Sequence, residues 1–319
     1  MPLSNEQHID VLRRMWLMRF FDEKAIQLYG EGRYRGSTHP YIAQEATALG
    51  VCAALEPDDL ALGTYRGHGL AIAKGADPRE MMAELLGKAA GLCGGKGGSM
   101  HFSQVGIGFL GSNAIVAGHI AIAGGVALAQ MLDKTNRVTV CFFGDGASCE
   151  GVFYETLNMA ALWKLPLVLV CENNEYAIST YYGDSISVPN ISMRAQGFGL
   201  PGVTVDGRDF FAVEQTAREA VARARAGEGP TLIEAKTVRW TRHSAVAAGG
   251  SGLDANADRW RKTDPIPRYT ATMLERRLLT EEQVAEIEQK AKDQIEAAAQ
   301  FAIDSPYPTT EDMYQDIFA

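Results

Sequence analysis

The clearest structural signal of the chain is the stretch from Val138 to Asn174, which reads VTVCFFGDGASCEGVFYETLNMAALWKLPLVLVCENN. It contains two short apolar runs, Val138–Phe143 and Leu167–Cys171, whose β-branched and aromatic residues are typical of buried parallel strands. Between them, Glu150–Trp163 has the length and composition of a helix. A strand, a helix and a second strand in this order predict a right-handed βαβ unit, and therefore an α/β protein with a parallel sheet.

The same alternation continues on both sides of this unit. We expect further helices over the first thirty residues, Gln44–Leu55, Ala114–Leu132, Phe210–Ala226 and Glu281–Phe301, and further strands over Val203–Val205 and Thr231–Arg239. No sequence repeat at a fixed period and no interdomain linker is visible. The sequence therefore predicts a single domain over residues 1–319, with an N-terminal helical segment over about 1–35 and a C-terminal helix and tail over about 278–319.

Composition excludes several classes of protein. The chain has 319 residues, with 30 basic and 39 acidic side chains and a formal charge of −9, which argues against nucleic acid as a partner. Its five cysteines are dispersed and form no CxxC pair, as expected in a reducing compartment. The segment Asn113–Leu132 is long enough to span a membrane, but it contains His119 and Gln130 and is mostly Ala and Gly, which favours a buried helix. Because the N-terminus also lacks an apolar signal core, we expect a cytoplasmic protein without a membrane segment.

Polar residues follow the two central strands at the point where each ends. Asp145 lies between two glycines after the first strand, and Asn173 and Asn174 follow the second. Ligands of open α/β sheets bind outside the carboxyl ends of the strands, so these side chains are expected to lie close together. Carboxylate and amide oxygens suit Mg²⁺, and the helix that begins near Glu150 offers free N–H groups to an anion. Taken alone, GDG could be an ordinary turn and the two asparagines an ordinary cap at the end of a strand. Together, at the ends of two consecutive strands, they predict a site for a divalent metal and a diphosphate.

The spacing and the surrounding words carry a family resemblance. GDG, 26 intervening residues and NN together are similar to the thiamine-diphosphate fingerprint. Longer matching words are TYRGHG at Thr64–Gly69, GGKGGSMH at Gly94–His101, NMAALWKLP at Asn158–Pro166 and CENNEYA at Cys171–Ala177. From about Arg13 to the C-terminal helix, the chain resembles the alpha subunit of the thiamine-dependent first component of 2-oxo acid (pyruvate dehydrogenase alpha-like) and acetoin dehydrogenase complexes. The resemblance implies the thiamine-diphosphate-binding fold, a central, mostly parallel sheet with helices on both faces.

The resemblance also assigns roles to individual residues. It implies Mg²⁺ ligation by the side chains of Asp145 and Asn174 and by the backbone carbonyl of Tyr176. The positions that it implies for binding thiamine diphosphate are Tyr65, Arg66, Val116, Asp145, Gly146, Ala147, Asn174 and His243. It further implies catalytic roles for His243 and His68, although a histidine in a Ser/Ala/Gly loop such as that of His243 is often simply solvated.

Partners follow from the resemblance as well. It implies a beta subunit that supplies the glutamate acting on the aminopyrimidine of the cofactor, an α2β2 heterotetramer, and a lipoyl-bearing acyltransferase as acyl acceptor. The implied substrate is a pyruvate-like 2-oxo acid or acetoin. Two other readings stay open at this point, namely the amino-terminal subunit of a split transketolase-like enzyme and a non-catalytic relative. The intact Asp145, Asn174, Tyr65 and Arg66 argue against loss of catalysis.

Three positions depart from the family pattern. Ser37 stands where pyruvate-type members have phenylalanine, which indicates a roomier or more polar pocket, and Ala114 replaces a common glycine. After Ser244 the sequence AVAAGGSGLDANADRW lacks the Asp-Pro and Tyr-Arg elements of the family, so the substrate and the acyl acceptor stay open. Its glycines lead us to expect that this loop is mobile without cofactor.

The glycine-rich run GGKGGS does not match a nucleotide-binding P-loop. That motif needs a glycine five residues before the second glycine and a Ser or Thr after the lysine, whereas this chain has Ala90 and Gly97 at those positions. Many of the 33 glycines lie around the proposed cofactor site and its loops, where we expect the backbone to approach a ligand or a partner.

Overall fold

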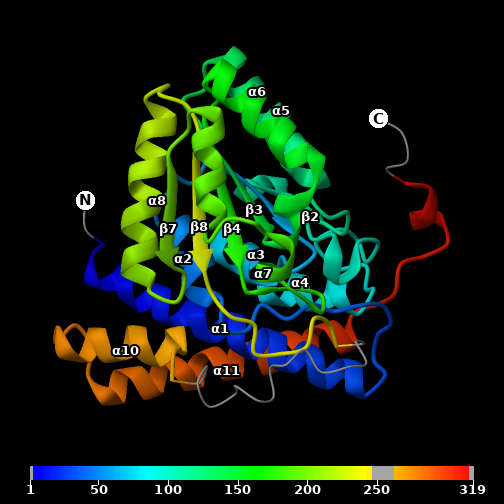
Figure 1. Cartoon of the computed structure of the whole chain (residues 1–319). Helices are drawn as coiled ribbons and strands as arrows, with labels where there is room; N and C mark the ends of the chain where they lie inside the picture. Colours follow the sequence, from blue (N-terminus) through cyan, green and yellow to red (C-terminus); the bar gives the residue numbers. More distant parts are fainter. Residues whose placement is uncertain (1–2, 246–261, 316–319) are drawn as a thin grey trace.

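A computed structural model describes residues 3–245 and 262–315 of the chain (Figure 1). Its centre is a six-stranded parallel sheet in the order β2-β1-β3-β4-β8-β7. The strands are β1 (Leu60–Thr64), β2 (Phe109–Asn113), β3 (Thr139–Gly144), β4 (Leu167–Asn173), β7 (Gly202–Asp206) and β8 (Thr231–Lys236). The α/β class and the parallel sheet expected from the sequence are confirmed, and β1 and β2 are additions that the sequence reading lacked.

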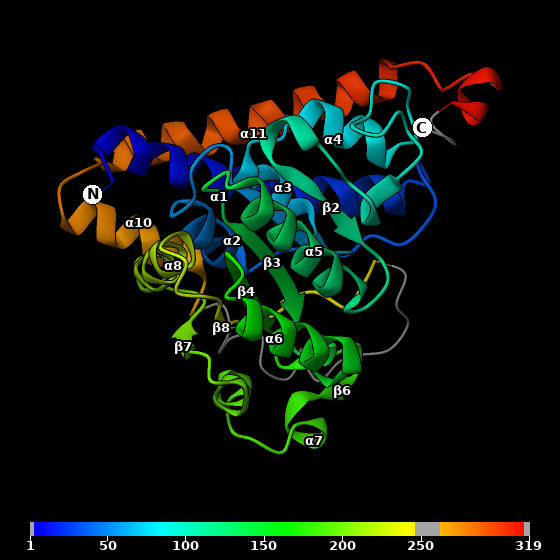
Figure 2. The ribbon, with the colours of Figure 1, turned by 90° about the horizontal axis from the view of Figure 1, so that it is seen from above.

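Helices cover both faces of this sheet (Figure 2). One face carries α1 and α11, whereas α5 and α6 lie on the other. The helices are α1 (Asn5–Gly30), α2 (Glu45–Cys52), α3 (His68–Lys74), α4 (Pro78–Leu85), α5 (Gly118–Asp133), α6 (Gly151–Trp163), α7 (Tyr182–Ser185), α8 (Phe210–Arg225), α10 (Pro265–Glu275) and α11 (Glu281–Asp304). A two-stranded antiparallel hairpin, β5 (Tyr176–Ala177) with β6 (Thr180–Tyr181), follows β4.

Alternation along the central strands divides the core between the two faces. In β3, Val140 and Phe142 belong to the cluster under α1, whereas Cys141 and Phe143 belong to the cluster under α5 and α6. All four side chains are buried, because a parallel sheet covered by helices on both faces leaves no polar side. This burial explains why the strand reads as a continuous apolar run.

The predicted helices are found with small shifts at their ends. The helix α1 begins with a capping box in which Ser4 and Gln7 exchange side-chain and backbone hydrogen bonds. In α11, Thr280 and Gln283 make the same exchange. The strand expected over Thr231–Arg239 ends at Lys236, and the chain then leaves the ladder. The segment after this strand contains Arg239 and His243.

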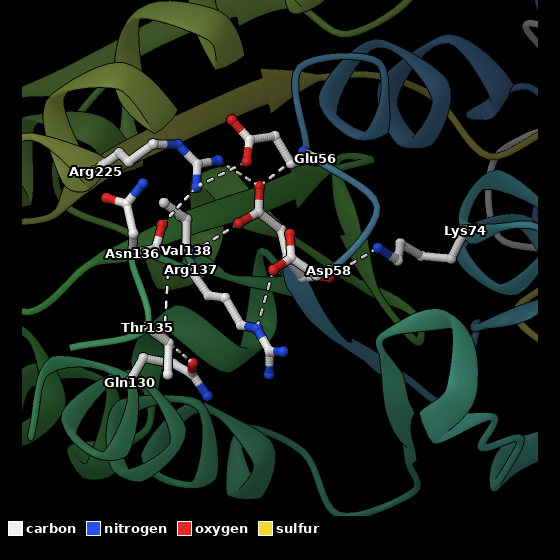
Figure 3. Close-up of polar contacts among 10 residues, drawn as sticks. Glu56, Asp58, Lys74, Gln130, Thr135, Asn136, Arg137, Val138 and Arg225 are labelled. Carbon is white, nitrogen blue, oxygen red and sulfur yellow. Dashed lines mark hydrogen bonds and ion pairs between the residues drawn. The ribbon is translucent and has the colours of Figure 1, made fainter. Parts of the chain in front are cut away.

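A polar network closes the amino-terminal edge of the sheet, on the side away from the carboxyl ends of the strands (Figure 3). The buried carboxylate of Asp59 accepts hydrogen bonds from the backbone N–H of Val138 at 2.7 Å and from Arg225 at 2.6 Å. Arg225 also donates to the carbonyl of Asn136 at 2.6 Å. This network therefore ties the starts of β1 and β3 to the end of α8.

Within the described residues, no helix is both long and apolar enough to cross a bilayer. The segment Asn113–Leu132, which the sequence marked for checking, forms the end of β2 and most of α5. Its His119 is buried and hydrogen-bonds to the carbonyl of Phe142 in the sheet. The helix therefore packs against the sheet as a part of the fold.

Candidate functional site

A cavity of about 470 Å³ opens at the carboxyl ends of the strands. Its walls come from the segments that follow β1, β2, β3, β4 and β8. The chain passes from β1 outward to β2, but from β3 it proceeds in the opposite direction to β4, so the order reverses between β1 and β3. Such a reversal point is where open α/β sheets bind their ligands.

Nine residues that the sequence singled out line this cavity, namely Tyr65, Arg66, Val116, Asp145, Gly146, Ala147, Asn174, Tyr176 and His243. They come from five separate segments of the chain, and the fold brings them together. The tenth, His68, does not line the cavity. The individual roles assigned to these residues stay predictions.

Two oxygen atoms at the cavity have no hydrogen-bond partner among the residues that the structure describes. They are Asp145 Oδ2 and Asn174 Oδ1, and both are buried. The amide of Asn174 is oriented by the side-chain oxygen of Gln44, which accepts a hydrogen bond from Nδ2 at 3.3 Å. Buried polar atoms are rarely left unsatisfied, so a carboxylate and an amide oxygen in this state fit a hard divalent cation.

The electrostatics of Asp145 agree with that fit. Burial raises the pKa of this carboxyl to about 6, because the charged form is taken out of water. Gly146, which follows Asp145, lets Ala177 pack closely against this turn, since a Cβ on Gly146 would lie 2.6 Å from the Cβ of Ala177. Among the described residues, no group of three His, Cys, Asp or Glu side chains could hold a metal ion. A cation here would therefore need amide and backbone oxygens in addition to Asp145.

Arg66 is held between two loops. It is buried, and its guanidinium donates to the carbonyl of Pro40 at 2.5 Å and to the carbonyl of His243 at 3.1 Å. Burial lowers the pKa of Arg66, while the nearby Tyr65 and Glu172 oppose that shift. A guanidinium remains charged in proteins, so Arg66 places a positive charge at the cavity where an anionic group would bind.

His243 is neutral and has a defined tautomer. Arg239, which is itself buried, donates a hydrogen bond to Nδ1 of His243 at 3.2 Å. Because a guanidinium can only donate, Nδ1 is the acceptor and the proton of the neutral ring sits on Nε2. Burial together with the charges of Arg66 and Arg239 lowers the pKa of His243 to about 4. The cavity thus contains an imidazole that can donate a hydrogen bond from Nε2 at neutral pH.

His39 is a cavity residue that the sequence reading missed. Its ring lies 4.4 Å from the ring of Tyr65 and 5.0 Å from the ring of His243, measured between centroids. Burial and the nearby Arg66 lower its pKa to about 3. Ser37 lies near this ring, with Oγ 3.5 Å from Nε2, but it does not line the cavity. No local pattern marks His39, because its significance depends on contacts with distant segments.

Two further lining residues were also missed, Glu172 and Arg239. Burial raises the pKa of Glu172 to about 7, and its carboxylate accepts a hydrogen bond from the hydroxyl of Tyr41. Arg239 donates to the carbonyls of Tyr176 at 3.4 Å and Ile178 at 3.1 Å. Glu172 lies in β4 and Arg239 in the segment after β8, and no local pattern in the sequence marks either position.

His68 lies behind the wall of the cavity. Its ring is fully buried, with Nδ1 2.7 Å from Asp22 Oδ1 and Nε2 2.9 Å from Ser99 Oγ. Both ring nitrogens are therefore occupied by protein partners. This geometry favours a role in holding the surrounding segments over direct contact with a substrate.

Comparison with known proteins identifies the family. The family model described as dehydrogenase E1 component matches residues 13–311. The chain belongs to the dehydrogenase E1 component family. Membership implies thiamine diphosphate as the cofactor of this E1 chain.

Relatives of this E1 chain match along its whole length. It is 41% identical to the alpha subunit of acetoin:2,6-dichlorophenolindophenol oxidoreductase from Bacillus subtilis, over 100% of this chain and 95% of that protein. It is 39% identical to the alpha subunit of pyruvate dehydrogenase E1 from Porphyra purpurea, over 100% of this chain and 97% of that protein. A second acetoin oxidoreductase alpha subunit, from Cupriavidus necator, is 39% identical over 100% of this chain and 96% of that protein.

One feature of the E1 chain lies outside the described residues. The divergent sequence after Ser244, which we expect to be mobile without cofactor, falls almost entirely within residues 246–261, outside the residues that the structure describes. Ser244 itself is buried, and the backbone N–H of Ala245 donates to the carbonyl of Thr38 at 2.8 Å. The segment therefore leaves the described part of the chain beside the loop that carries His39.

Proposed function

We propose that this E1 chain, the alpha subunit of a thiamine-diphosphate-dependent dehydrogenase, acts on acetoin or a pyruvate-like 2-oxo acid and passes the acyl group to lipoamide. The observation that carries the proposal is the convergence of Asp145, Asn174 and Arg66 on one cavity in a chain of this family. The relatives are named as acetoin and pyruvate enzymes, which fits a dehydrogenase and not the transketolase-like alternative.

In this proposal the chain binds the diphosphate end of the cofactor through Mg²⁺. Asp145 and Asn174 supply the two unpaired side-chain oxygens, and Tyr176 supplies a backbone carbonyl. Arg66 and Tyr65 face the diphosphate, together with the backbone of Gly146 and Ala147. Val116 meets the aminopyrimidine through its main chain. The unsatisfied state of Asp145 and Asn174 is what supports a cation between them.

The chemistry of the bond change belongs to the cofactor. When bound, thiamine diphosphate would supply a nucleophilic carbon and an electron sink for cleavage of the C–C bond beside the substrate carbonyl. His243 donates a hydrogen bond from Nε2 to the oxygen that gains charge, and Arg239 keeps the tautomer that makes this possible. His68 acts as a positioning residue, since neither of its ring nitrogens is free to reach a substrate.

A beta subunit completes the site in this proposal. Exposed apolar side chains gather on α5, α6 and the turn before α5, including Ile115, Val116, Ile122, Leu132, Met159, Leu162 and Trp163. Leu162 is 73% exposed and Leu132 is 68% exposed. Soluble monomers rarely expose several large apolar side chains together, so this surface is typical of a protein–protein interface. Val116 belongs both to this surface and to the wall of the cavity. A partner seated there would therefore reach the cavity and could place its own carboxylate beside the cofactor in an α2β2 assembly.

A non-catalytic relative is the remaining alternative. Loss of catalysis would leave the charged residues of the cavity without a purpose, yet Asp145, Arg66 and Arg239 are all kept in buried positions. Maintaining unpaired or desolvated charges costs stability, and such groups cluster at functional sites. This cost favours an active enzyme.

The decisive experiment is an assay of the chain together with its beta chain. The two are co-expressed, supplied with thiamine diphosphate and Mg²⁺, and offered acetoin, pyruvate and branched 2-oxo acids with 2,6-dichlorophenolindophenol as electron acceptor. Reduction of the dye with one of these substrates is expected, and only in the presence of both chains. Ketol transfer between sugar phosphates without dye reduction would support the transketolase-like reading, and tight cofactor binding without any turnover would support the non-catalytic one.

A further inference from the structure

The glycine-rich loop wraps around a carboxylate of the protein itself. Glu84 lies in α4 and is fully buried. Its Oε2 accepts hydrogen bonds from the backbone N–H groups of Cys93 and Gly95, both at 2.8 Å, and its Oε1 accepts from Gly97 at 2.7 Å and Gly98 at 3.0 Å. Four backbone donors on one side-chain anion form the kind of concave nest that other glycine-rich loops offer to phosphate.

The glycines are needed for this arrangement. A Cβ on Gly91 would lie 2.4 Å from Glu84 Oε2, and a Cβ on Gly97 would lie 2.7 Å from the carbonyl oxygen of His101. Gly95 has a φ of +79°, and its Cβ would lie 2.7 Å from the carbonyl carbon of Gly87. Side chains at these positions would push the loop away from Glu84. The backbone of the glycine-rich run thus closely approaches an anion of the protein itself.

The far end of the same loop reaches the cavity. Ser99 is hydrogen-bonded to the buried pair of His68 and Asp22, and the next residue, Met100, lines the cavity. Glu84 therefore holds one end of the loop and His68 the other. Met100 follows Ser99 directly, so these two anchors immediately before it restrict where its backbone can lie.

We propose that Glu84 is a positioning residue for the reaction, which acts by fixing the Cys93–Gly98 loop so that Met100 forms its part of the cavity wall. The proposal rests on the proposed function for its kinetic consequence, but its structural consequence is independent of turnover. Glu84 makes no contact with the cavity, and its effect passes only through the loop. A wall displaced by about 1 Å is enough to lower the rate of an enzyme considerably.

The informative variant is Glu84→Gln. An amide of the same shape keeps one acceptor oxygen, but its NH₂ group faces two backbone N–H donors and cannot accept from them. Two of the four backbone N–H groups of the loop therefore lose their hydrogen-bond acceptor. Glu80→Gln is the matched control, because Glu80 lies one turn earlier on α4, is only half-buried and accepts a single hydrogen bond from Gln104.

The test measures the loop, the wall and the reaction separately in the assembled enzyme. Hydrogen exchange reports on the amides of residues 93–98, and the methyl resonance of Met100 in ¹³C-methyl-methionine NMR reports on the wall. For Glu84→Gln we expect loss of amide protection, a shifted Met100 resonance and a fall of at least about tenfold in kcat/KM per bound cofactor, with thiamine diphosphate affinity within about threefold of the unaltered enzyme. Glu80→Gln is expected to change none of these quantities.

Unchanged protection and an unchanged Met100 resonance would overturn the proposal, as would a displaced loop with unaltered kcat/KM per bound cofactor. If the unaltered enzyme turns over no substrate, the proposed function fails, while the exchange and NMR measurements still decide whether Glu84 positions the wall. If Glu84→Gln does not fold, Gly97→Ala displaces the same loop from its other side and should give the same three effects. Its control is Gly106→Ala, because nothing lies within 4 Å of a Cβ at that position.

Discussion

Arg66 donates a hydrogen bond to the main-chain carbonyl of His243, although 177 positions of sequence separate the two residues. The contact joins the turn after β1 to the segment that follows β8, across the cavity. It also places a permanent positive charge beside an imidazole, which discourages protonation of that ring. The charge state of His243 therefore depends on a residue that is proposed to bind the diphosphate.

The first prediction concerns pH. Because the pKa of His243 is about 4 in the folded chain, below the usual 6.5, the unfolded chain binds this proton first as pH falls. The free energy of unfolding should therefore decline as pH is lowered from 6.5 towards 4, and less steeply in His243→Gln. Urea unfolding at a series of pH values measures the slope. Titration of the His243 ring near 6.5 by NMR would contradict the neutral imidazole.

The second prediction concerns the metal. Replacing the carboxylate in Asp145→Asn removes the charged ligand of the proposed Mg²⁺ site, so Mg²⁺-dependent affinity for thiamine diphosphate should fall by at least about 100-fold. Isothermal titration calorimetry of the assembled enzyme checks it. Asp293→Asn, on the exposed face of α11, is the control and should bind as the unaltered enzyme does. Full affinity in Asp145→Asn would mean that the cation, if any, binds elsewhere.

The third prediction separates stability from the site. Asp59→Asn breaks the buried contact with Arg225 at the amino-terminal edge of the sheet and should lower the free energy of unfolding by roughly 3 kcal/mol. The adjacent Asp58→Asn removes only the exposed pair with Arg137 and should cost at most about 0.5 kcal/mol. Denaturant unfolding compares the two. Equal effects would show that the buried network of Figure 3 contributes no more than a surface ion pair.

The fourth prediction concerns assembly. A charge in the exposed apolar surface should disfavour a partner seated there, so Leu162→Asp and Leu132→Asp should each weaken association with the beta chain by at least about tenfold. Analytical ultracentrifugation of the mixed chains measures this. Lys290→Glu, an exposed charge change on α11, should leave association intact. Unaltered assembly in both leucine variants would place the partner on another face.

The sequence predicted the centre of the fold well because β3 and β4 are buried on both sides and read as continuous apolar runs. It missed β1 and β2, since LALGT and FLGSN contain glycine, serine and alanine and have little strand propensity of their own. These strands exist because of their neighbours, as when Leu60 pairs with Thr139 of β3. Pairing with neighbouring strands, and not local sequence preference, therefore determines that β1 and β2 form.

The residues of the site also divide into those that a local pattern predicts and those that only tertiary contacts reveal. Asp145 and Asn174 follow predicted strands at a recognisable spacing, and the fold places both at the cavity. His39, Arg239 and Glu84 have no local signal, because what they do depends on contacts that only the folded chain makes: His39 lies against Tyr65, Arg239 bonds the carbonyl of Ile178, and Glu84 binds backbone N–H groups of a loop. Residues of this kind are found only when the chain is seen in three dimensions.

The apolar surface of α5 and α6 has a consequence for how the protein must be made. If the beta subunit binds this surface as proposed, the newly synthesised chain exposes Leu132 and Leu162 until that subunit is bound, and can associate non-specifically through them. Balanced synthesis of the two subunits would keep that interval short. For the laboratory, the same property means that soluble yield should depend on the ratio of the two chains during expression.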